Sequence, residues 1–237
     1  MKEKLEHLAL ILDGNGRWAK KINQARTYGH QVGMEKIKDF CIYAHKHEIK
    51  FLTVFTFSTE NWNRPQKEVD FLMEVPNKIF SDGKIDFFME NNIKINWIGR
   101  ESKIPASTLK AILDAKEKTK NNNGLVLTIA FDYGSWEELT HCFKQIVLKQ
   151  PKLKENLDII DDVLIKNNLY TKDIPNVDLV IRTGGETRLS NFMMLQCSYA
   201  EIYFNKKMWP DFSQKDLKKA ISYYNKVNRR FGGIADE

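Results

Sequence analysis

The chain has 237 residues, of which 42% are hydrophobic and 29% are charged, enough apolar residues for one substantial core. The net charge of +6 fits an anionic ligand or an acidic membrane surface but does not by itself indicate nucleic-acid binding. No apolar run reaches the roughly 20 residues that a transmembrane helix needs. The three cysteines are far apart and lack metal-ligand spacing, so we expect reduced thiols and a cytoplasmic protein.

Short apolar runs alternate with amphipathic stretches along the whole chain. The predicted elements are, in chain order, a strand at 7–12, a helix at 30–48, a strand at 51–57, a helix at 66–90, a strand at 93–98, a helix at 105–120, a strand at 125–131, helices at 135–148 and 158–167, strands at 177–181 and 200–204, and a helix at 213–229. Pro76 and Gly83 predict a kink or break near Val75.

Strands that alternate with helices of ten or more residues are typical of βαβ units. We therefore expect one α/β domain over residues 1–237, with a parallel sheet flanked by helices. The polar stretch at 149–176 is interpreted as a peripheral insertion. The segments after the first, second, fourth and fifth strands should lie on one rim of the sheet, where ligands bind in open α/β folds.

The first of these segments, Asp13-Gly14-Asn15-Gly16-Arg17-Trp18, follows a buried strand. Glycines let backbone N–H groups approach an anion, and a carboxylate such as Asp13 binds hard cations. These residues suit a magnesium-bound phosphate or diphosphate. A structural turn with Asp13 as a helix cap is the plain alternative. A dinucleotide site is disfavoured because the second strand lacks the terminal acidic residue.

Arginines accompany the other rim segments. Arg26 and His30 lie just beyond the first turn, and Arg182 and Arg188 bracket two glycines before Ser190. Because arginine binds phosphate in a bidentate manner, two such segments favour two phosphorylated ligands or one long polyphosphate over a solvated basic loop.

Glu201 stands among apolar and aromatic residues, so its carboxylate should have a metal or an arginine as partner.

These motifs resemble those of the cis-prenyltransferases, and of undecaprenyl diphosphate synthases in particular. The resemblance runs from about residue 7 to the end of the chain. It rests on DGNGRWAK at 13–20 with Arg26 and His30, FSTENWNRP at 57–65, IRTGGETRLSNF at 181–192, and YAEIYF and WPDF at 199–212. It implies a homodimer with a central six-stranded, mainly parallel sheet and a hydrophobic tunnel between sheet and helices.

The resemblance also implies a reaction, the magnesium-dependent, repeated cis-condensation of isopentenyl diphosphate onto an allylic diphosphate such as farnesyl diphosphate. The product would be a long polyprenyl diphosphate of about undecaprenyl length, a lipid carrier precursor for cell-wall polysaccharides. No nucleic-acid partner is expected, and contact with the inner face of the membrane should be transient and peripheral. A catalytically silent partner subunit is disfavoured because the catalytic motifs are present.

Residue roles carry over by motif. Asp13 is expected to hold Mg²⁺ and assist the leaving group, with Glu201 as the second metal-associated carboxylate. Asn61 is expected to help remove the proton, by orienting its path because a neutral amide is a weak base. The substrate-binding residues implied are Gly14, Asn15, Gly16, Arg17, Trp18, Arg26, His30, Ser58, Thr59, Glu60, Trp62, Arg64, Arg182, Arg188, Leu189, Ser190, Arg230 and Gly232.

The sequence also departs from the family pattern. Asp132 stands where asparagine is usual, Trp136 stands where arginine is usual, and Pro76 is unusual in the helix expected to line the tunnel. The candidate tunnel-wall residues on that helix are Val69, Leu72, Met73 and Ile79. Product length therefore does not carry over from the family.

Overall fold

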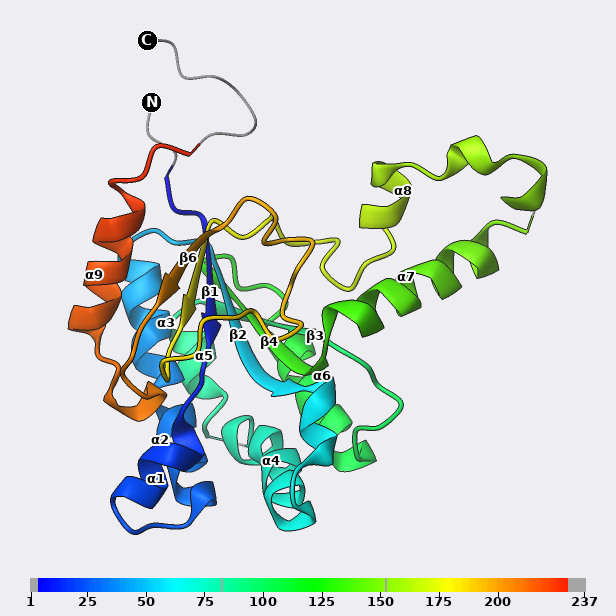
Figure 1. Cartoon of the computed structure of the whole chain (residues 1–237). Helices are drawn as coiled ribbons and strands as arrows, with labels where there is room; N and C mark the ends of the chain where they lie inside the picture. The colour runs from blue at the N-terminus through cyan, green and yellow to red at the C-terminus, as the bar shows by residue number, and fades with distance from the viewer. Residues whose placement is uncertain (1–3, 82, 152, 230–237) are drawn as a thin grey trace.

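A computed structural model describes residues 4–81, 83–151 and 153–229, and its centre is one six-stranded sheet in the order β3-β4-β2-β1-β5-β6 (Figure 1). Every neighbouring pair of strands is parallel, which confirms the predicted sheet and makes it wholly parallel. The strands are β1 (His7–Ile11), β2 (Phe51–Ser58), β3 (Ile93–Ile98), β4 (Leu125–Tyr133), β5 (Leu179–Arg182) and β6 (Glu201–Phe204). Arg230 and Gly232 lie outside the described residues.

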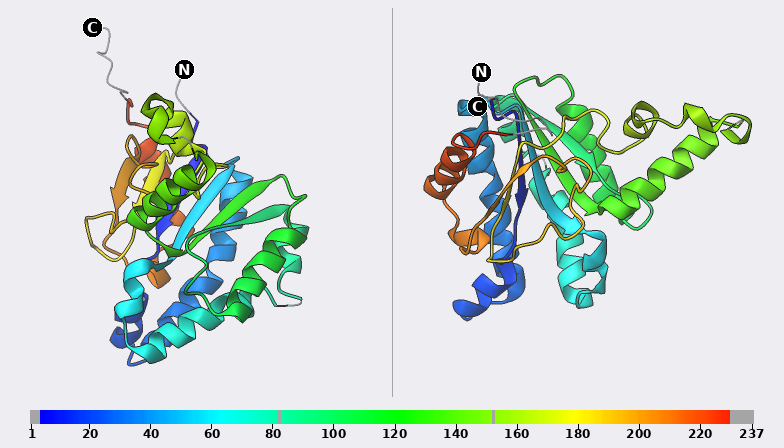
Figure 2. Two further views of the ribbon diagram at one scale, coloured as in Figure 1. Left: turned by 90° about the vertical axis from the view of Figure 1, so that its right-hand side faces the viewer. Right: turned by 45° about the horizontal axis from the view of Figure 1, so that its top comes forward.

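Helices pack mainly against one face of this sheet, and α7 begins on the other (Figure 2). The helices are α1 (Asn15–Lys21), α2 (Arg26–Glu35), α3 (Ile37–Lys46), α4 (Gln66–Ile79), α5 (Asp86–Glu90), α6 (Ala106–Lys118), α7 (Ser135–Lys149), α8 (Asp162–Lys166) and α9 (Gln214–Tyr224). Four short 3-10 helices complete the described structure: η1 (Thr59–Asn63), η2 (Leu153–Glu155), η3 (Leu157–Ile159) and η4 (Trp209–Asp211).

Each face of the sheet has its own core because side chains alternate along a strand. Leu8 and Leu10 of β1 join the large core with α3, α4, α5, α6 and α9. Ala9 and Ile11 of the same strand join a smaller core with the segment at 189–200. The segment after β5 thus covers the second face and also reaches the rim.

Two of the predicted helices are each divided into two in the structure. The helix predicted at 30–48 begins earlier, at Arg26, and is divided into α2 and α3 at Lys36. The helix predicted at 66–90 is interrupted, but between Ile79 and Asp86 rather than near Val75, since α4 continues through Pro76 to Ile79 and α5 begins at Asp86. Pro76 cannot donate a helical hydrogen bond and its ring crowds the preceding turn, and α4 ends three residues later.

The polar stretch at 149–176 is peripheral, as predicted. It holds η2, η3 and the short α8, and together with α7 it projects away from the body of the molecule (Figure 1). We call α7, α8 and the residues between them the arm. Asp161 caps α8 by accepting a 2.7 Å hydrogen bond from the Leu164 N–H, so this helix begins later than the predicted 158–167.

Candidate active site

A polar pocket of about 290 Å³ lies at the carboxyl ends of the parallel strands. In the sheet register, Ile11 pairs with Phe55 and with Arg182, so the segments after β1, β2 and β5 meet at one rim. The lining combines three predicted motifs: Asp13, Asn15, His30, Ser58, Asn61, Arg64, Arg182, Arg188 and Ser190 all face it. The predicted convergence is confirmed for these three segments, whereas the segment after β4 does not line this pocket.

Asp13 is the centre of this rim. Its Oδ2 lies 3.0 Å from Nη2 of Arg182, and its Oδ1 lies 3.2 Å from Nη2 of Arg17. Gly184 (φ 84°) makes the close approach possible, since a Cβ there would lie 3.1 Å from the Asp13 carbonyl carbon and 2.8 Å from Arg17 Nη2. Glycine is therefore required where the β5 segment passes the β1 turn.

Arg182 is 5% exposed, and its guanidinium is oriented by the segment that follows it. One nitrogen, Nη1, donates to the Ser190 Oγ at 2.7 Å and to the Arg188 carbonyl oxygen. The other, Nη2, meets Asp13. Buried Nε has no partner among the described residues. The side chain is thus preorganised and keeps donor capacity for a ligand in the pocket.

Glu68, on α4, is a site residue that the sequence did not reveal. Its carboxylate accepts from Arg26 Nε at 2.8 Å and Arg64 Nη1 at 2.9 Å, and it lies 3.1 Å from His30 Nε2. The hydrogen bond from His30 lowers the pKa of Glu68 well below its ordinary value, helped by Arg26 and Arg64 and opposed by burial. One buried carboxylate therefore gathers three predicted diphosphate contacts beside the Asp13 turn.

Gly16 serves the same cluster. A Cβ at this position would lie 2.6 Å from the Arg26 guanidinium carbon, so the Arg26 head group passes directly over the glycine.

The 3-10 helix η1 brings Asn61 to the pocket. The Asn61 Oδ1 accepts a 3.1 Å hydrogen bond from the Ser58 backbone N–H, so the side chain offers mainly its amide N–H donors to a ligand. The neighbouring Trp62 indole donates to Asp132 Oδ1 at 2.7 Å, and Arg100 binds the same carboxylate with two nitrogens at 3.0 Å. The segment after β2 that is predicted to bind substrate is therefore held in place by Asp132 of β4.

Among the described residues, nine predicted substrate-binding residues do not line this pocket: Gly14, Gly16, Arg17, Trp18, Arg26, Thr59, Glu60, Trp62 and Leu189. Three of them have other partners. The Trp18 indole donates to Asp211 Oδ1 at 2.8 Å and stacks on Tyr28. Leu189 packs against the smaller core. Thr59 Oγ1 is hydrogen-bonded to Glu60 Oε2 at 3.0 Å.

Glu201 begins β6 and pairs in register with Leu179, whereas Arg182 and the rim lie at the other end of these strands, roughly 10 Å away at the usual rise per residue. Within one chain the structure does not bring Glu201 to Asp13.

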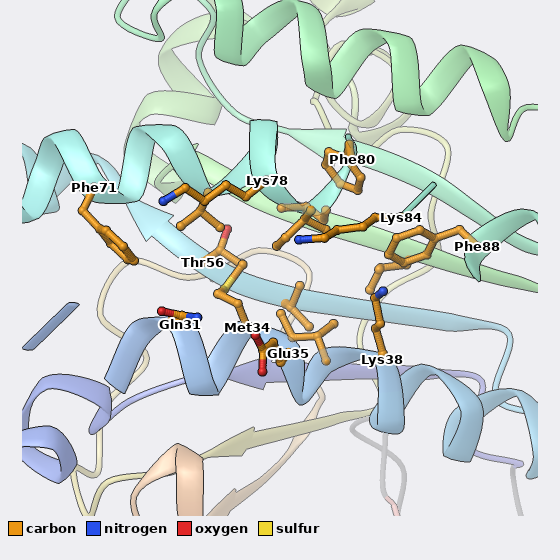
Figure 3. A pocket seen from close by; sticks show the side chains of 16 residues that line it. Gln31, Met34, Glu35, Lys38, Thr56, Phe71, Lys78, Phe80, Lys84 and Phe88 are labelled. Atoms are coloured by element: carbon orange, nitrogen blue, oxygen red, sulfur yellow. The ribbon is translucent and has the colours of Figure 1, made fainter. Parts of the chain in front are cut away.

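An apolar cavity of about 380 Å³ continues from the polar pocket, and Met34 and Thr56 line both (Figure 3). Phe71, Val75 and Ile79 of α4 form one wall at helical spacing, and Phe80 and Phe88 lie toward one end. Of the predicted wall residues, Ile79 lines this cavity, Leu72 lines the polar pocket, and Val69 and Met73 lie in the large core. The cavity lies between sheet and helices, as predicted for the tunnel.

The donor set at Asp13 fits a magnesium ion that shares its coordination with a substrate. Magnesium is held by one or two carboxylates together with phosphate oxygens and water rather than by a protein cage. Asp13 is partly exposed at the pocket, with 28% of its side chain accessible. No cluster of three His, Cys, Asp or Glu ligands occurs among the described residues, so a protein-only metal cage is absent from that part of the chain.

Comparisons with known proteins agree with this geometry. The Prenyltransf family model, described as undecaprenyl diphosphate synthase, matches residues 11–232. The chain is 45% identical to an isoprenyl transferase of Streptococcus pneumoniae, with 96% of this chain and 92% of the relative aligned. It is 44% identical to an isoprenyl transferase of Clostridium perfringens, with 97% and 90% aligned.

Two solved structures have the same fold. A lavandulyl diphosphate synthase from Lavandula x intermedia, in complex with dimethylallyl diphosphate, superposes with a TM-score of 0.91 at 33% identity over 96% of this chain and 98% of that one. A probable undecaprenyl diphosphate synthase from Campylobacter jejuni superposes with a TM-score of 0.80 at 30% identity over 98% and 100%. In the described residues of this chain, no helix is long and apolar enough to span a membrane.

Proposed function

The chain belongs to the undecaprenyl diphosphate synthase family of prenyltransferases, and from this we propose that it extends an allylic diphosphate, farnesyl diphosphate, with successive isopentenyl units in cis. In each round the allylic carbon–oxygen bond breaks, a carbon–carbon bond forms, and the isopentenyl unit loses a proton. The observation that carries the proposal is the Asp13–Arg182 contact, which joins two anion-binding segments at the entrance of an apolar cavity.

The allylic diphosphate is assigned to the side of the pocket that holds His30 and Arg64, with Arg26 beside them on Glu68. Glu68 fixes these three groups, so their donors are oriented before substrate arrives. Asp13 would hold Mg²⁺, which when bound would neutralise the charge that gathers on the departing diphosphate. Preorganised donors that face developing charge are the larger part of such catalysis. Glu201 remains a predicted metal-associated residue.

Isopentenyl diphosphate is assigned to Arg182, Arg188 and Ser190. The Arg182–Ser190 hydrogen bond holds the two donors together, and Arg182 Nε, which has no partner in the described part of the chain, can bind a phosphate oxygen. Arginine is suited to this role because it stays charged when it is buried. Arg188 is more exposed, and its Nη1 pairs with Glu186 Oε2 at 2.7 Å.

Asn61 is assigned to the proton path. Because its Oδ1 already accepts the Ser58 N–H, the side chain presents donors, and a donor cannot remove a proton. We therefore assign Asn61 to orient a diphosphate oxygen or a water molecule that accepts the proton from the isopentenyl unit.

The apolar cavity is assigned to the growing tail. Aromatic and branched side chains at Phe71, Val75 and Ile79 remove hydrocarbon from water as each unit is added. A long polyprenyl diphosphate of about undecaprenyl length, a lipid carrier precursor for the cell wall, is the proposed product. The greasy product also favours transient, peripheral contact with a membrane.

A homodimer is proposed because the arm is apolar yet exposed. Phe143, Val147 and Leu148 on α7 are 50%, 61% and 74% exposed, and Leu157 and Val163 beyond it are 64% and 62% exposed. Exposed apolar patches of this extent mark interaction surfaces. Arg230 and Gly232, which the family resemblance assigns to substrate binding, lie outside the described residues, and their role stays a prediction.

The test is direct. The purified chain, Mg²⁺, farnesyl diphosphate and labelled isopentenyl diphosphate are incubated together, and the products are sized by chromatography. A ladder that ends in long polyprenyl diphosphates is expected. A chain that binds both diphosphates without elongation would instead be a silent partner subunit.

A further inference from the structure

The segment that carries Ser190 adopts an unusual backbone conformation. Ser190, Asn191 and Met193 have φ values of 52°, 63° and 44°, in the left-handed region that side chains other than glycine rarely adopt. Such a conformation persists only where surrounding contacts hold it. Asn191 supplies those contacts, and neither the diphosphate pocket nor the cores account for its side chain.

Asn191 completes the N-terminus of α7. The residue before this helix is Gly134, which has no side chain for a cap. The Asn191 carbonyl oxygen accepts from the Ser135 N–H at 2.8 Å, and Asn191 Oδ1 accepts from the Trp136 N–H at 3.1 Å. A Cβ at Gly134 would lie 2.6 Å from Asn191 Nδ2. The glycine thus leaves room for a cap that comes from a segment 55 residues away.

The side-chain amide nitrogen of Asn191 contacts η1, the segment after β2 that carries Asn61. Asn191 Nδ2 donates to Glu60 Oε1 at 2.7 Å, and Glu60 directly precedes Asn61 in η1. Partial burial raises the pKa of Glu60, but the hydrogen bonds from Asn191, its own backbone, Thr59 and Ser58 outweigh it and leave the pKa below its ordinary value. Glu60 is therefore held as a carboxylate, a strong acceptor for the Asn191 amide.

We propose that Asn191 is a positioning residue that fixes Ser190 and Arg182 relative to Asn61, and so aligns isopentenyl diphosphate with its proton path. This inference rests on the proposed function. The Asn191 side chain therefore connects the segment after β5 to both α7 and η1. A shift of about 1 Å in such an alignment costs about 100-fold in rate.

The test exchanges donor and acceptor. In Asn191→Asp, one carboxylate oxygen still caps α7, but the other faces Glu60 and repels it. We expect kcat/KM for isopentenyl diphosphate to fall about tenfold, with KM for farnesyl diphosphate within about twofold of wild type. Glu60→Gln alone removes the charge that Asn191→Asp would face, and its activity is the reference for the double variant. When Glu60→Gln is combined with Asn191→Asp, the new amide can donate to the new carboxylate, so activity should recover to within about threefold of that reference.

The controls separate positioning from folding. Asn123→Ala removes a side chain that pairs with Asn92 at the amino ends of β3 and β4, away from the rim, and should leave both KM values unchanged. Thermal unfolding of each variant reports on the α7 cap. An active wild type whose double variant does not recover, or equal changes in both KM values for Asn191→Asp, overturns this inference alone. A wild type that does not extend farnesyl diphosphate overturns the proposed function as well.

Discussion

Arg182 Nη2 lies 3.0 Å from Asp13 Oδ2, although the two residues are 169 positions apart. Parallel pairing of β1 with β5 in the register Ile11–Arg182 sets this contact, and Gly184 removes the steric obstacle to it. The two predicted diphosphate segments thus share an ion pair. When Mg²⁺ and a diphosphate enter the pocket, Mg²⁺ competes with Arg182 for the Asp13 carboxylate. The diphosphate competes with Asp13 for the Arg182 guanidinium.

Replacement of Asp13 tests the metal and leaving-group role. Asp13→Ala removes the carboxylate that faces the pocket, and we expect turnover to fall at least about 1,000-fold, as for loss of a principal electrostatic group. Asp13→Ala also removes the counter-charge of the buried Arg182, so we expect some loss of thermal stability, and turnover is compared at a temperature where both proteins are folded. Labelled isopentenyl diphosphate incorporation at saturating Mg²⁺ measures turnover. Near-normal turnover would refute the assignment of Asp13.

Replacement of Arg182 tests the division of the two substrates. Arg182→Ala deletes charge-assisted hydrogen bonds worth about 1.5–3 kcal/mol, or about 10- to 100-fold in affinity. We expect KM for isopentenyl diphosphate to rise by that factor and KM for farnesyl diphosphate to rise less than about threefold, since Arg17 still pairs with Asp13. Steady-state kinetics with each substrate varied in turn measures both. An equal rise in the two KM values would contradict the division.

The sequence predicts the sheet well because each strand is a short apolar run that stops at a turn. It also predicts the rim, since parallel strands bring their carboxyl ends together. It does not predict Glu68, because the contacts of that carboxylate with Arg26 and His30 cross about 40 residues and depend on how α2 packs against α4. The sequence does carry one local signal for Glu68. Arg64 and Glu68 are four residues apart at the start of α4, a spacing at which their side chains can pair.

Trp18 is a different case. Motif position assigns this residue to substrate, which stays a prediction, and the structure pairs its indole with Asp211 of η4. A motif identifies which residues recur together, and it does not distinguish those that touch a ligand from those that hold the turn in place.

Glu68→Gln should make stability less sensitive to acid. A carboxyl group whose pKa is lowered in the folded state stabilises the protein above its ordinary pKa of 4.5, and this contribution is lost as the pH falls below that value. At pH 7 we expect the variant to lose about 1–2 kcal/mol, since Arg26 and Arg64 are partly in water. Urea unfolding at pH 7 and near pH 3.5 compares the two proteins.

The difference between wild type and Glu68→Gln should shrink at the lower pH. Glu74→Gln is the matched control, since Glu74 is exposed on the same helix and accepts only from Asn77 among the described residues. A stability difference that is constant from pH 7 to 3.5 would argue against a lowered pKa of Glu68.

Asp132→Asn restores the residue usual in the family and tests why this chain differs. Asp132 is fully buried, and its carboxylate pairs with Arg100, whose own pKa is raised mainly by this hydrogen bond. The amide would keep an acceptor for Trp62 but would leave the Arg100 guanidinium without this counter-charge. We expect a loss of about 1–3 kcal/mol in the free energy of unfolding, with KM values nearly unchanged.

The double variant Asp132→Asn with Arg100→Gln should recover part of that stability, because it removes the unpaired charge along with the carboxylate. Denaturant unfolding of the four proteins gives the coupling free energy. A coupling near zero would mean that Arg100 is not the reason for the aspartate at this position.

Charged substitutions on the arm test the proposed dimer. Phe143→Lys and Val147→Lys, one turn apart on α7, place ammonium groups on its exposed apolar side, where a partner subunit would have to desolvate them. We expect the pair to weaken the dimer at least about 100-fold, enough for monomers to dominate at micromolar concentration in sedimentation velocity. Leu113→Lys is the matched control, an exposed leucine (44%) on α6 that should leave association unchanged. If the arm variants sediment as wild-type dimers, the dimer forms on another surface, and the proposal that the arm carries it fails.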